Sequence, residues 1–380
     1  MAGNFTRRTL LATTAAAGLA ACGRKRAPRY SGWLFIASAG DRGIAVADLA
    51  EFRRVTTIPL PQTPGQIVPA SARVFATCPE ARLVCEIDPV RLAVANRANM
   101  PGRIVAVRAA PGGASLIVAT DHPAALHIVA ASTLRISATV ALPDTPIAMD
   151  ISDTLAVLSL ANNWVARVSL TGGHLLGSTN IGLRGRVVGL RPDGKSILVG
   201  AEGQNQIVTL DAGSGALLAR LPIAFAPTRF CFSADNGGQM FVSGTGDDQI
   251  AIVSPYQNEV DQTLVAAHKP YGMTVAVIEE RNLLCVTNSG SADLTIFDID
   301  TRGLASSIHI GGNPGEVLIT PDGAYALVVD RDSGDVSVVR MSVALNHKAG
   351  SLSLQETKPL FTVFHTGTAP QSAAIVPREI

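Results

Sequence analysis

Arginine recurs at one position of a repeating pattern in this chain, two residues after a proline or its equivalent. The successive repeats place at this position Gln66, Arg103, Ala148, Arg186, Arg229, Gly272, Glu316 and Ser372. A guanidinium group is planar and always charged, and it binds a carboxylate or a phosphate through two parallel hydrogen bonds. If these positions face one opening, the arginines with a single acid predict a positively charged funnel for a small anionic ligand. The alternative is that the arginines pair with Glu316, with acidic loop residues or with backbone carbonyls.

Histidines and acidic residues in the predicted loops are further candidates for chemistry. His268 and Glu316 are the candidates for activating a water molecule in catalysis. Asp247, Asp248 and His122 are the candidates for holding a metal ion, although no EF-hand spacing is present. The sequence also lacks a G-x-S-x-G elbow, an H-E-x-x-H pair and a Walker P-loop. The absence of a complete catalytic motif leaves the status of the chain as an enzyme open and favours a non-catalytic role.

The element that must position these residues is a hairpin that recurs along most of the chain. One copy, LLCVTNSGSADLTIFDIDT at 283–301, has an apolar run, a polar break and a second run that alternates polar with apolar residues. Two strands joined by a break of Gly, Asp, Asn or Ser form a hairpin. The residues that end the second run, from Asp48 to Arg340, follow one another at intervals of 39 to 44 residues. With one further strand on each side of the hairpin, this period predicts an all-β fold, a β-propeller of four-stranded blades.

The positions of the prolines give an independent count of the blades. A proline precedes the first strand of most repeats, from Pro64 to Pro370, and LRGR at 183–186 occupies the slot that lacks one. Both patterns favour eight blades, with seven as the alternative if 148–186 is not a true blade. The first repeat begins with three strands, and the chain ends in AAIVPREI at 373–380, which is typical of a lone inner strand. We therefore expect the C-terminal strand to join the N-terminal blade and close the ring, which removes exposed sheet edges.

The tetrapeptide CVTN at 285–288, with the hairpin that follows it, resembles the repeat of the YVTN-type β-propeller family. The resemblance covers nearly all of residues 31–377, with Cys285 in place of the tyrosine. Proteins of this kind include surface or periplasmic repeat proteins, lactonase-like hydrolases of sugar lactones, and quinoprotein-like or tetrapyrrole-binding redox propellers. The resemblance implies the fold, because such a scaffold carries many unrelated activities.

Three functions are compatible with these residues. The favoured one is a lipid-anchored binding or interaction scaffold, with a small anionic ligand at the channel mouth or a protein of the cell envelope as its partner. The second is a 6-phosphogluconolactonase-like sugar-lactone hydrolase, in which the arginines hold the anionic group of the substrate. The third is a propeller that binds a tetrapyrrole or redox cofactor, with His122 or His268 as candidate axial ligands. The sequence requires no cofactor.

The N-terminal segment is typical of an export signal and a tether. Arg7 and Arg8 precede an apolar stretch, which resembles a twin-arginine signal, and LAAC at 19–22 resembles a lipoprotein signal with Cys22 as the lipidated residue. The apolar stretch is shorter than the roughly 20 residues that a membrane-spanning helix needs. The chain thus divides into a signal peptide at 1–21, a lipidated tether at 22–30 and a single propeller domain at 31–380. We expect a membrane-anchored lipoprotein that faces the periplasm or the cell exterior; the alternative is an uncleaved basic tail.

The composition of the chain argues against nucleic acid as a binding partner. A formal net charge of +1 gives no reason to expect binding to nucleic acid, and an aromatic content of 4% argues against a base-stacking surface. Cys78 and Cys85 flank a hairpin turn, and an oxidising compartment would permit a disulfide between them, which stays open. Cys231 and Cys285 are expected to be small buried hydrophobic residues. We expect a monomer.

Overall fold

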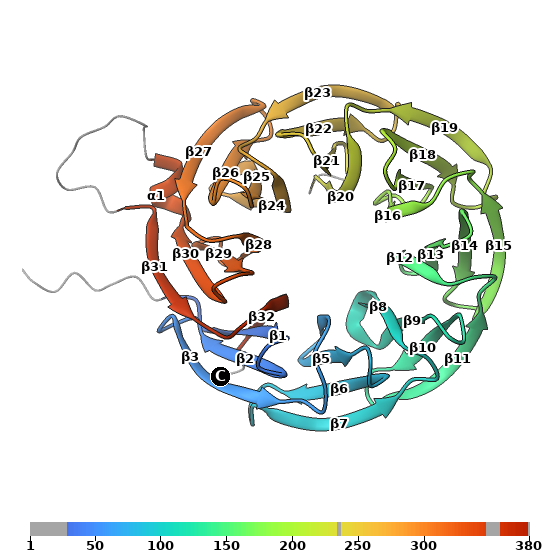
Figure 1. Ribbon diagram of the computed structural model, residues 1–380, viewed down its shortest axis with the longest axis horizontal. Helices are drawn as coiled ribbons and strands as arrows, with labels where there is room; N and C mark the ends of the chain where they lie inside the picture. Colours follow the sequence, from blue (N-terminus) through green and yellow to red (C-terminus); the bar gives the residue numbers. More distant parts are fainter. Residues whose placement is uncertain (1–28, 234–236, 347–357, 379–380) are drawn as a thin grey trace, which may run out of the picture.

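A computed structural model of the chain describes residues 29–233, 237–346 and 358–378 (Figure 1). These residues form eight four-stranded antiparallel sheets, arranged as blades around a central channel, which confirms the predicted propeller and its blade count. Blade 1 contains β1 (Gly32–Ser38), β2 (Gly43–Asp48), β3 (Arg53–Pro59) and β32 (Pro370–Pro377). Because β32 pairs with β1, the ring is closed by strands from the two ends of the chain, as predicted. The described residues include no helix that is long and apolar enough to cross a bilayer.

Each of the other blades is built from four consecutive strands that run from the channel outward (Figure 1). Blades 2 to 4 contain β4 (Ile67–Ala70), β5 (Arg73–Cys78), β6 (Leu83–Asp88), β7 (Ala93–Asn99), β8 (Ile104–Ala109), β9 (Ser115–Thr120), β10 (Ala125–Ala130), β11 (Arg135–Ala141), β12 (Pro146–Ile151), β13 (Leu155–Leu160), β14 (Trp164–Ser169) and β15 (His174–Asn180). Blades 5 to 8 contain β16 (Gly185–Leu190), β17 (Ser196–Ala201), β18 (Gln206–Asp211), β19 (Leu217–Pro222), β20 (Ala226–Phe232), β21 (Met240–Thr245), β22 (Gln249–Ser254), β23 (Glu259–Val265), β24 (Pro270–Ile278), β25 (Arg281–Asn288), β26 (Asp293–Asp298), β27 (Gly303–His309), β28 (Pro314–Ile319), β29 (Tyr325–Asp330), β30 (Asp335–Arg340) and β31 (Leu360–His365). Two short helical segments, η1 (Pro111–Gly113) and α1 (Met341–Asn346), follow β8 and β30.

The hydrophobic core lies between blades. All six residues of β2 are buried, whereas the outer strand β3 is largely exposed, because a middle strand has a neighbouring sheet on each face. Buried apolar residues among the described part of the chain form eight clusters, each shared by two adjacent blades. Leu34 of blade 1 and Leu327 of blade 8, for example, lie in one cluster. Full burial of one such side chain contributes about 1.5–3 kcal/mol, which accounts for the near-continuous apolar runs of the middle strands.

Bulges shift the register of the strands that line the channel. The register slips near the start of seven inner strands, while β4 pairs with β5 without a slip. A bulge inserts an extra residue into one strand, so side chains after it move relative to the partner strand. Equivalent bulges occur in blades 3, 5 and 6, but the residue in the place of Pro227 is Ile104 in blade 3, three residues after Pro101, and Gly185 in blade 5. A fixed number of residues after a proline therefore does not reach the same place in each blade. The residues that occupy the register of Arg229 in blades 3 and 5 are Ala106 and Val187.

Candidate ligand-binding site

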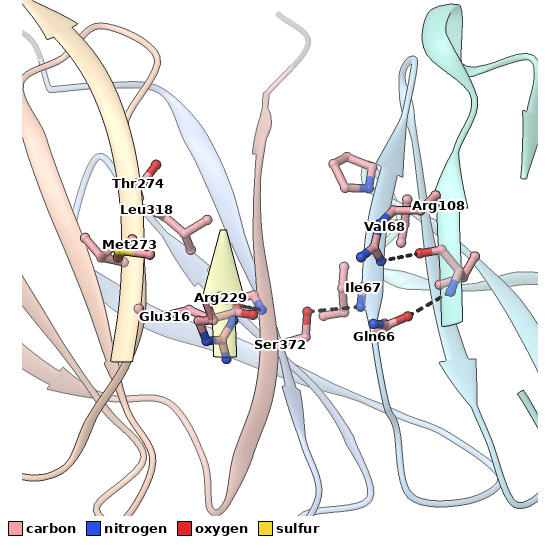
Figure 2. Close-up of a pocket in the computed structure, with 15 residues that line it drawn as sticks. Gln66, Ile67, Val68, Arg108, Arg229, Met273, Thr274, Glu316, Leu318 and Ser372 are labelled. Atoms are coloured by element: carbon pink, nitrogen blue, oxygen red, sulfur yellow. Dashed lines mark hydrogen bonds between the residues drawn. The ribbon is translucent and has the colours of Figure 1, made fainter. Parts of the chain in front are cut away.

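The channel wall is formed by the inner strand of each blade, and side chains tie these strands to one another (Figure 2). The free edge of a strand leaves backbone N–H groups without a sheet partner. Side chains of the preceding blade accept hydrogen bonds from several of them: Glu316 Oε2 from Ala373 at 2.9 Å, Ser372 Oγ from Ile67 at 3.3 Å and Gln66 Oε1 from Val107 at 2.8 Å. Gln66 and Glu316 thus hold adjacent blades together as well as facing the channel.

A cavity of about 450 Å³ lies in the channel between these inner strands (Figure 2). Five of the positions predicted to ring the mouth line this cavity, namely Gln66, Arg229, Gly272, Glu316 and Ser372. They come from five blades and are brought together because each stands near the start of an inner strand. Five of the eight predicted positions therefore lie around one cavity.

Arg229 is held by an aromatic ring. Its guanidinium carbon lies 4.2 Å from the centre of the Tyr271 ring, and that of Arg331 lies 4.1 Å from the same centre. Within the described part of the chain, neither guanidinium has a carboxylate at ion-pair distance. Contact with the face of a ring leaves the N–H groups at the edge of a guanidinium available as donors. Arg229 therefore offers unused donors and an unpaired charge to the cavity.

Two carboxyl groups of the channel are disfavoured in their charged form. Burial raises the pKa of Glu316, and the N–H of Ala373 and the charge of Arg229 oppose that rise only in part. Burial likewise raises the pKa of Asp150 on β12, although its Oδ2 accepts a hydrogen bond from the backbone N–H of Leu190 at 2.8 Å. The surroundings of the channel therefore destabilise the charged form of both acids.

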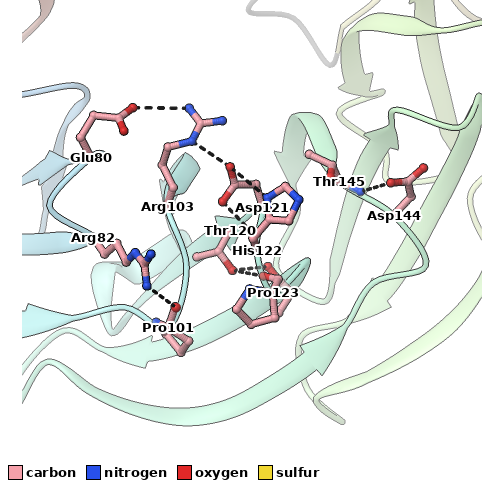
Figure 3. A network of polar contacts seen from close by, with 11 residues as sticks. Glu80, Arg82, Pro101, Arg103, Thr120, Asp121, His122, Pro123, Asp144 and Thr145 are labelled. Carbon is pink, nitrogen blue, oxygen red and sulfur yellow. Dashed lines mark hydrogen bonds and ion pairs between the residues drawn. The ribbon is translucent and has the colours of Figure 1, made fainter.

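Arg103 belongs to a different network, at the mouth (Figure 3). Its Nε donates to Asp121 Oδ2 at 2.8 Å, and its Nη1 lies 3.7 Å from Glu80 Oε1. Burial acts to raise the pKa of Asp121, but the hydrogen bonds from Arg103 and from the N–H of His122 outweigh it and lower that pKa. Arg103 does not line the channel cavity, and its charge is matched by loop acids.

Arg186, like Arg103, is paired with a loop acid. Its Nη1 lies 3.8 Å from Glu202 Oε1, and Arg184 Nε lies 3.0 Å from Glu202 Oε2. Arg186 is the bulged residue of β16, and Val187 takes the register of Arg229. Of the three arginines in the predicted ring, only Arg229 therefore lines the channel cavity, and the pairing with loop acids weighed as the alternative describes the other two.

The loop candidates lie apart from the channel cavity. His268 Nδ1 is 3.0 Å from Asp248 Oδ1, and the N–H of Lys269, followed by His268 itself, lowers the pKa of Asp248. Asp247 lies half-buried beside them, and the side chain of His122 is 85% exposed. Across residues 29–233, 237–346 and 358–378, no cluster of three or more His, Cys, Asp or Glu side chains could hold a metal ion. Metal binding by these residues stays a prediction without a coordination site to support it.

The sequence reasoning missed several residues of the site. Arg108 on β8, with Met273 and Thr274 on β24, also lines the channel cavity. Tyr271 stands between Pro270 and Gly272, and this place beside a predicted ring position was a usable signal. Arg331 lies in the hairpin loop between β29 and β30, and no sequence pattern links that loop to the channel. A further cavity of about 580 Å³ at the mouth is lined by Gln66, Arg103 and Arg184 among others.

The cysteines take no part in the site. The four described cysteines are free thiols, so the disulfide left open for Cys78 and Cys85 is not formed. Cys285 is fully buried, in keeping with the expectation for a small hydrophobic residue. Cys22, the candidate for lipidation, lies outside the described residues.

Comparisons with known proteins show a shared fold. No protein-family model matches the chain, and no curated protein matches it at a significant level. NirN, a dihydro-heme d1 dehydrogenase solved in complex with DHE, is similar in structure with a TM-score of 0.68 and 15% identity, over 90% of this chain and 74% of that one. Hydrazine synthase of Kuenenia stuttgartiensis has a TM-score of 0.55 and 17% identity over 72% and 90% of the two chains. BamB of Moraxella catarrhalis has a TM-score of 0.59 and 9% identity over 78% and 88%. At these identities the likeness shows a β-propeller and no more.

Proposed function

We propose that this propeller is a binding protein that holds a small anionic organic molecule in its central channel. The observation that carries the proposal is Arg229, a guanidinium without an acid partner in the described structure, at the wall of a cavity of about 450 Å³. Arg108 lines the same cavity and donates through Nη1 to the carbonyl of Val107 at 3.0 Å, which leaves its other donors free. Small-molecule sites commonly have this size and combine apolar walls with a few polar groups.

The second candidate is a tetrapyrrole, which is a particular anionic ligand. It is favoured by the structural likeness to NirN, whose structure was solved with DHE. The guanidiniums of Arg108 and Arg229 fit carboxylate side chains, and the sulfur of Met273 is the one haem-iron ligand type that this cavity offers among its lining residues. His122 and His268, the predicted axial ligands, do not line it. Met273 is therefore the better candidate.

The lactone hydrolase has less support. Glu316 lines the cavity with its pKa raised by burial, as suits a group that exchanges a proton, but one of its oxygens is bound to the Ala373 N–H. His268 is paired with Asp248 away from the cavity. This activity stays an alternative that rests on Glu316 alone.

The export and the anchor extend the proposal. We infer from Arg7, Arg8 and Cys22 that the chain is exported as a lipoprotein and acts at a membrane, facing the periplasm or the cell exterior. A partner protein of the envelope would then meet the propeller at a membrane surface. Mass spectrometry of the N-terminal peptide from exported protein tests this: a diacylated or triacylated Cys22 supports the anchor, and an unmodified Met1 contradicts it.

The test of the channel site is a titration of the purified chain with citrate, followed by calorimetry, and with haemin, followed by visible absorption. Hydrogen bonds to charged groups contribute about 1.5–3 kcal/mol, so Arg229→Met should weaken binding by about tenfold to a hundredfold. Arg135→Met is the matched control, because Arg135 is exposed on an outer strand. Absence of binding by both probes, or equal affinities for wild type and Arg229→Met, would refute the proposal.

A further inference from the structure

A second cavity, of only about 30 Å³, adjoins the channel cavity at its mouth. Arg229, Glu316 and Ser372 line both cavities, whereas Tyr271 and Arg331 line the small one and not the large one. A space of this size admits a water molecule or one carboxylate group, and it excludes the body of an organic molecule. The two cavities therefore form a large space and a small space that meet at Arg229, Glu316 and Ser372.

We propose that the small cavity is an oxyanion subsite, which takes a terminal carboxylate of a ligand whose body fills the channel cavity. This inference rests on the proposed function and specifies the chemical class of the ligand. The ligand is an organic acid whose carboxylate lies at the end of an arm, and the arm is long enough to reach from the channel cavity into the small cavity. Arg229 stands at the boundary between the two cavities and contacts both parts of such a ligand.

The donors for a carboxylate are present and unused. Arg331 Nη2 donates to Asn313 Oδ1 at 2.9 Å, while its Nε is buried without a hydrogen-bond partner in the described structure. A buried donor without a partner is unfavourable, and an oxyanion beside it would satisfy it. The Tyr271 ring fixes both Arg331 and Arg229 by cation–π contact, so neither needs to be ordered when the ligand binds. Glu316 also lines the small cavity, and burial disfavours its charged form.

Two glycines create the space in which Arg331 lies. A Cβ at Gly315 would be 2.7 Å from Arg331 Cγ, and a Cβ at Gly272 would be 2.3 Å from the carbonyl oxygen of Gly315. Thr287 closes this contact between blades 7 and 8, since its Oγ1 accepts from the N–H of Gly272 at 2.8 Å and donates to the Gly315 carbonyl at 2.7 Å. The arginine stem therefore lies against glycine backbone, and a single methyl group at Gly315 would displace it without changing any charge.

The experiment is arginine-selective labelling of the full-length chain with phenylglyoxal, with acetate as the probe. Labelling rates of individual arginines are read from peptide masses in sodium acetate and in sodium chloride of equal ionic strength. We expect acetate to slow the labelling of Arg229 and Arg331 at least threefold and to leave that of the exposed Arg135 unchanged. Gly315→Ala, which keeps both arginines, should abolish the protection of Arg229, and Arg331→Lys, which keeps the charge and loses the planar fork, should reduce it.

The outcomes separate this inference from the proposed function. If acetate protects neither arginine, or protects Arg135 equally, the oxyanion subsite is wrong, and binding of citrate or haemin through Arg229 decides the channel site by itself. If acetate protects both arginines and no larger probe binds, the subsite stands and the channel proposal fails. Circular dichroism of Gly315→Ala establishes that it is folded, and should it not fold, Arg331→Lys supplies the deciding comparison.

Discussion

Replacing Arg167 by methionine should loosen the contact between blades 4 and 5. Arg167 lies on β14 and is 6% exposed, and its guanidinium reaches the turn that precedes β19. There it donates to the carbonyl of Ala212 at 3.1 Å, to that of Ser214 at 2.8 Å and to that of Gly213. Methionine keeps the apolar stem and removes all of these hydrogen bonds.

The expected loss is smaller than the sum of the bonds. Each hydrogen bond from a charged donor contributes about 1.5–3 kcal/mol, so three set an upper limit of about 4.5–9 kcal/mol. The carbonyls of Gly213 and Ser214 belong to exposed residues and regain hydrogen bonds with water in the variant. Removing the guanidinium also removes the cost of burying its charge. We therefore expect the free energy of unfolding to fall by about 2–4 kcal/mol.

The assay is urea unfolding followed by circular dichroism, combined with amide hydrogen exchange. Because a ring of eight blades can unfold in more than one step, local exchange is the deciding measurement. The N–H of Gly215, which donates to the carbonyl of Asp211 at 2.8 Å, should exchange faster in Arg167→Met and not in Arg135→Met. An unchanged urea midpoint together with unchanged exchange at Gly215 would show that this contact does not hold the blades together.

Three further predictions concern the channel and the thiols. Gly272→Ala should lower the free energy of unfolding by about 1–3 kcal/mol, because its methyl group would meet the Gly315 carbonyl; an unchanged thermal midpoint would contradict the close contact. Burial raises the pKa of Glu316 above its ordinary value of 4.5, so the folded state binds this proton more tightly than the unfolded chain. The stabilisation is complete below pH 4.5 and is lost as the pH rises through the folded-state pKa, so wild type should lose stability relative to Glu316→Gln over that window; urea midpoints with the same pH dependence would refute this. Burial raises the pKa of Cys285 to about 12, while a hydrogen bond with the Cys85 thiol lowers that of Cys78, so iodoacetamide at pH 8 should label Cys78 before Cys285, as peptide masses would show.

The sequence was sufficient for the architecture. The apolar runs with a regular break, and the prolines that precede most repeats, are local properties of the sequence. Each repeat needs the same four strands so that both faces of its sheet are buried between two neighbouring blades. The closing strand could also be predicted, because an inner strand with no hairpin after it can complete only a blade that lacks one. The structure confirms the eight sheets and the pairing of β32 with β1.

The site was predicted in part. Gln66, Arg229 and Glu316 line one cavity, as a ring of equivalent positions requires. Arg103 and Arg186 stand at the predicted offset in sequence and at a different place in space, because Arg103 precedes β8 and Arg186 is the bulged residue of β16. A proline marks the turn between two blades, but it does not fix the residue at which the next inner strand begins.

By itself, the chain's sequence determined how many blades form and which segments supply their strands, because periodicity and turn chemistry act over a few residues. Only the tertiary structure decided which charges stay unpaired. Arg103 finds Asp121 across its own blade, whereas Arg229, Tyr271 and Arg331 meet from three different blades. Contacts of the second kind exist only after the ring has closed and the blades have packed at fixed distances, so the grouping of Arg229, Tyr271 and Arg331 is a property of the assembled ring.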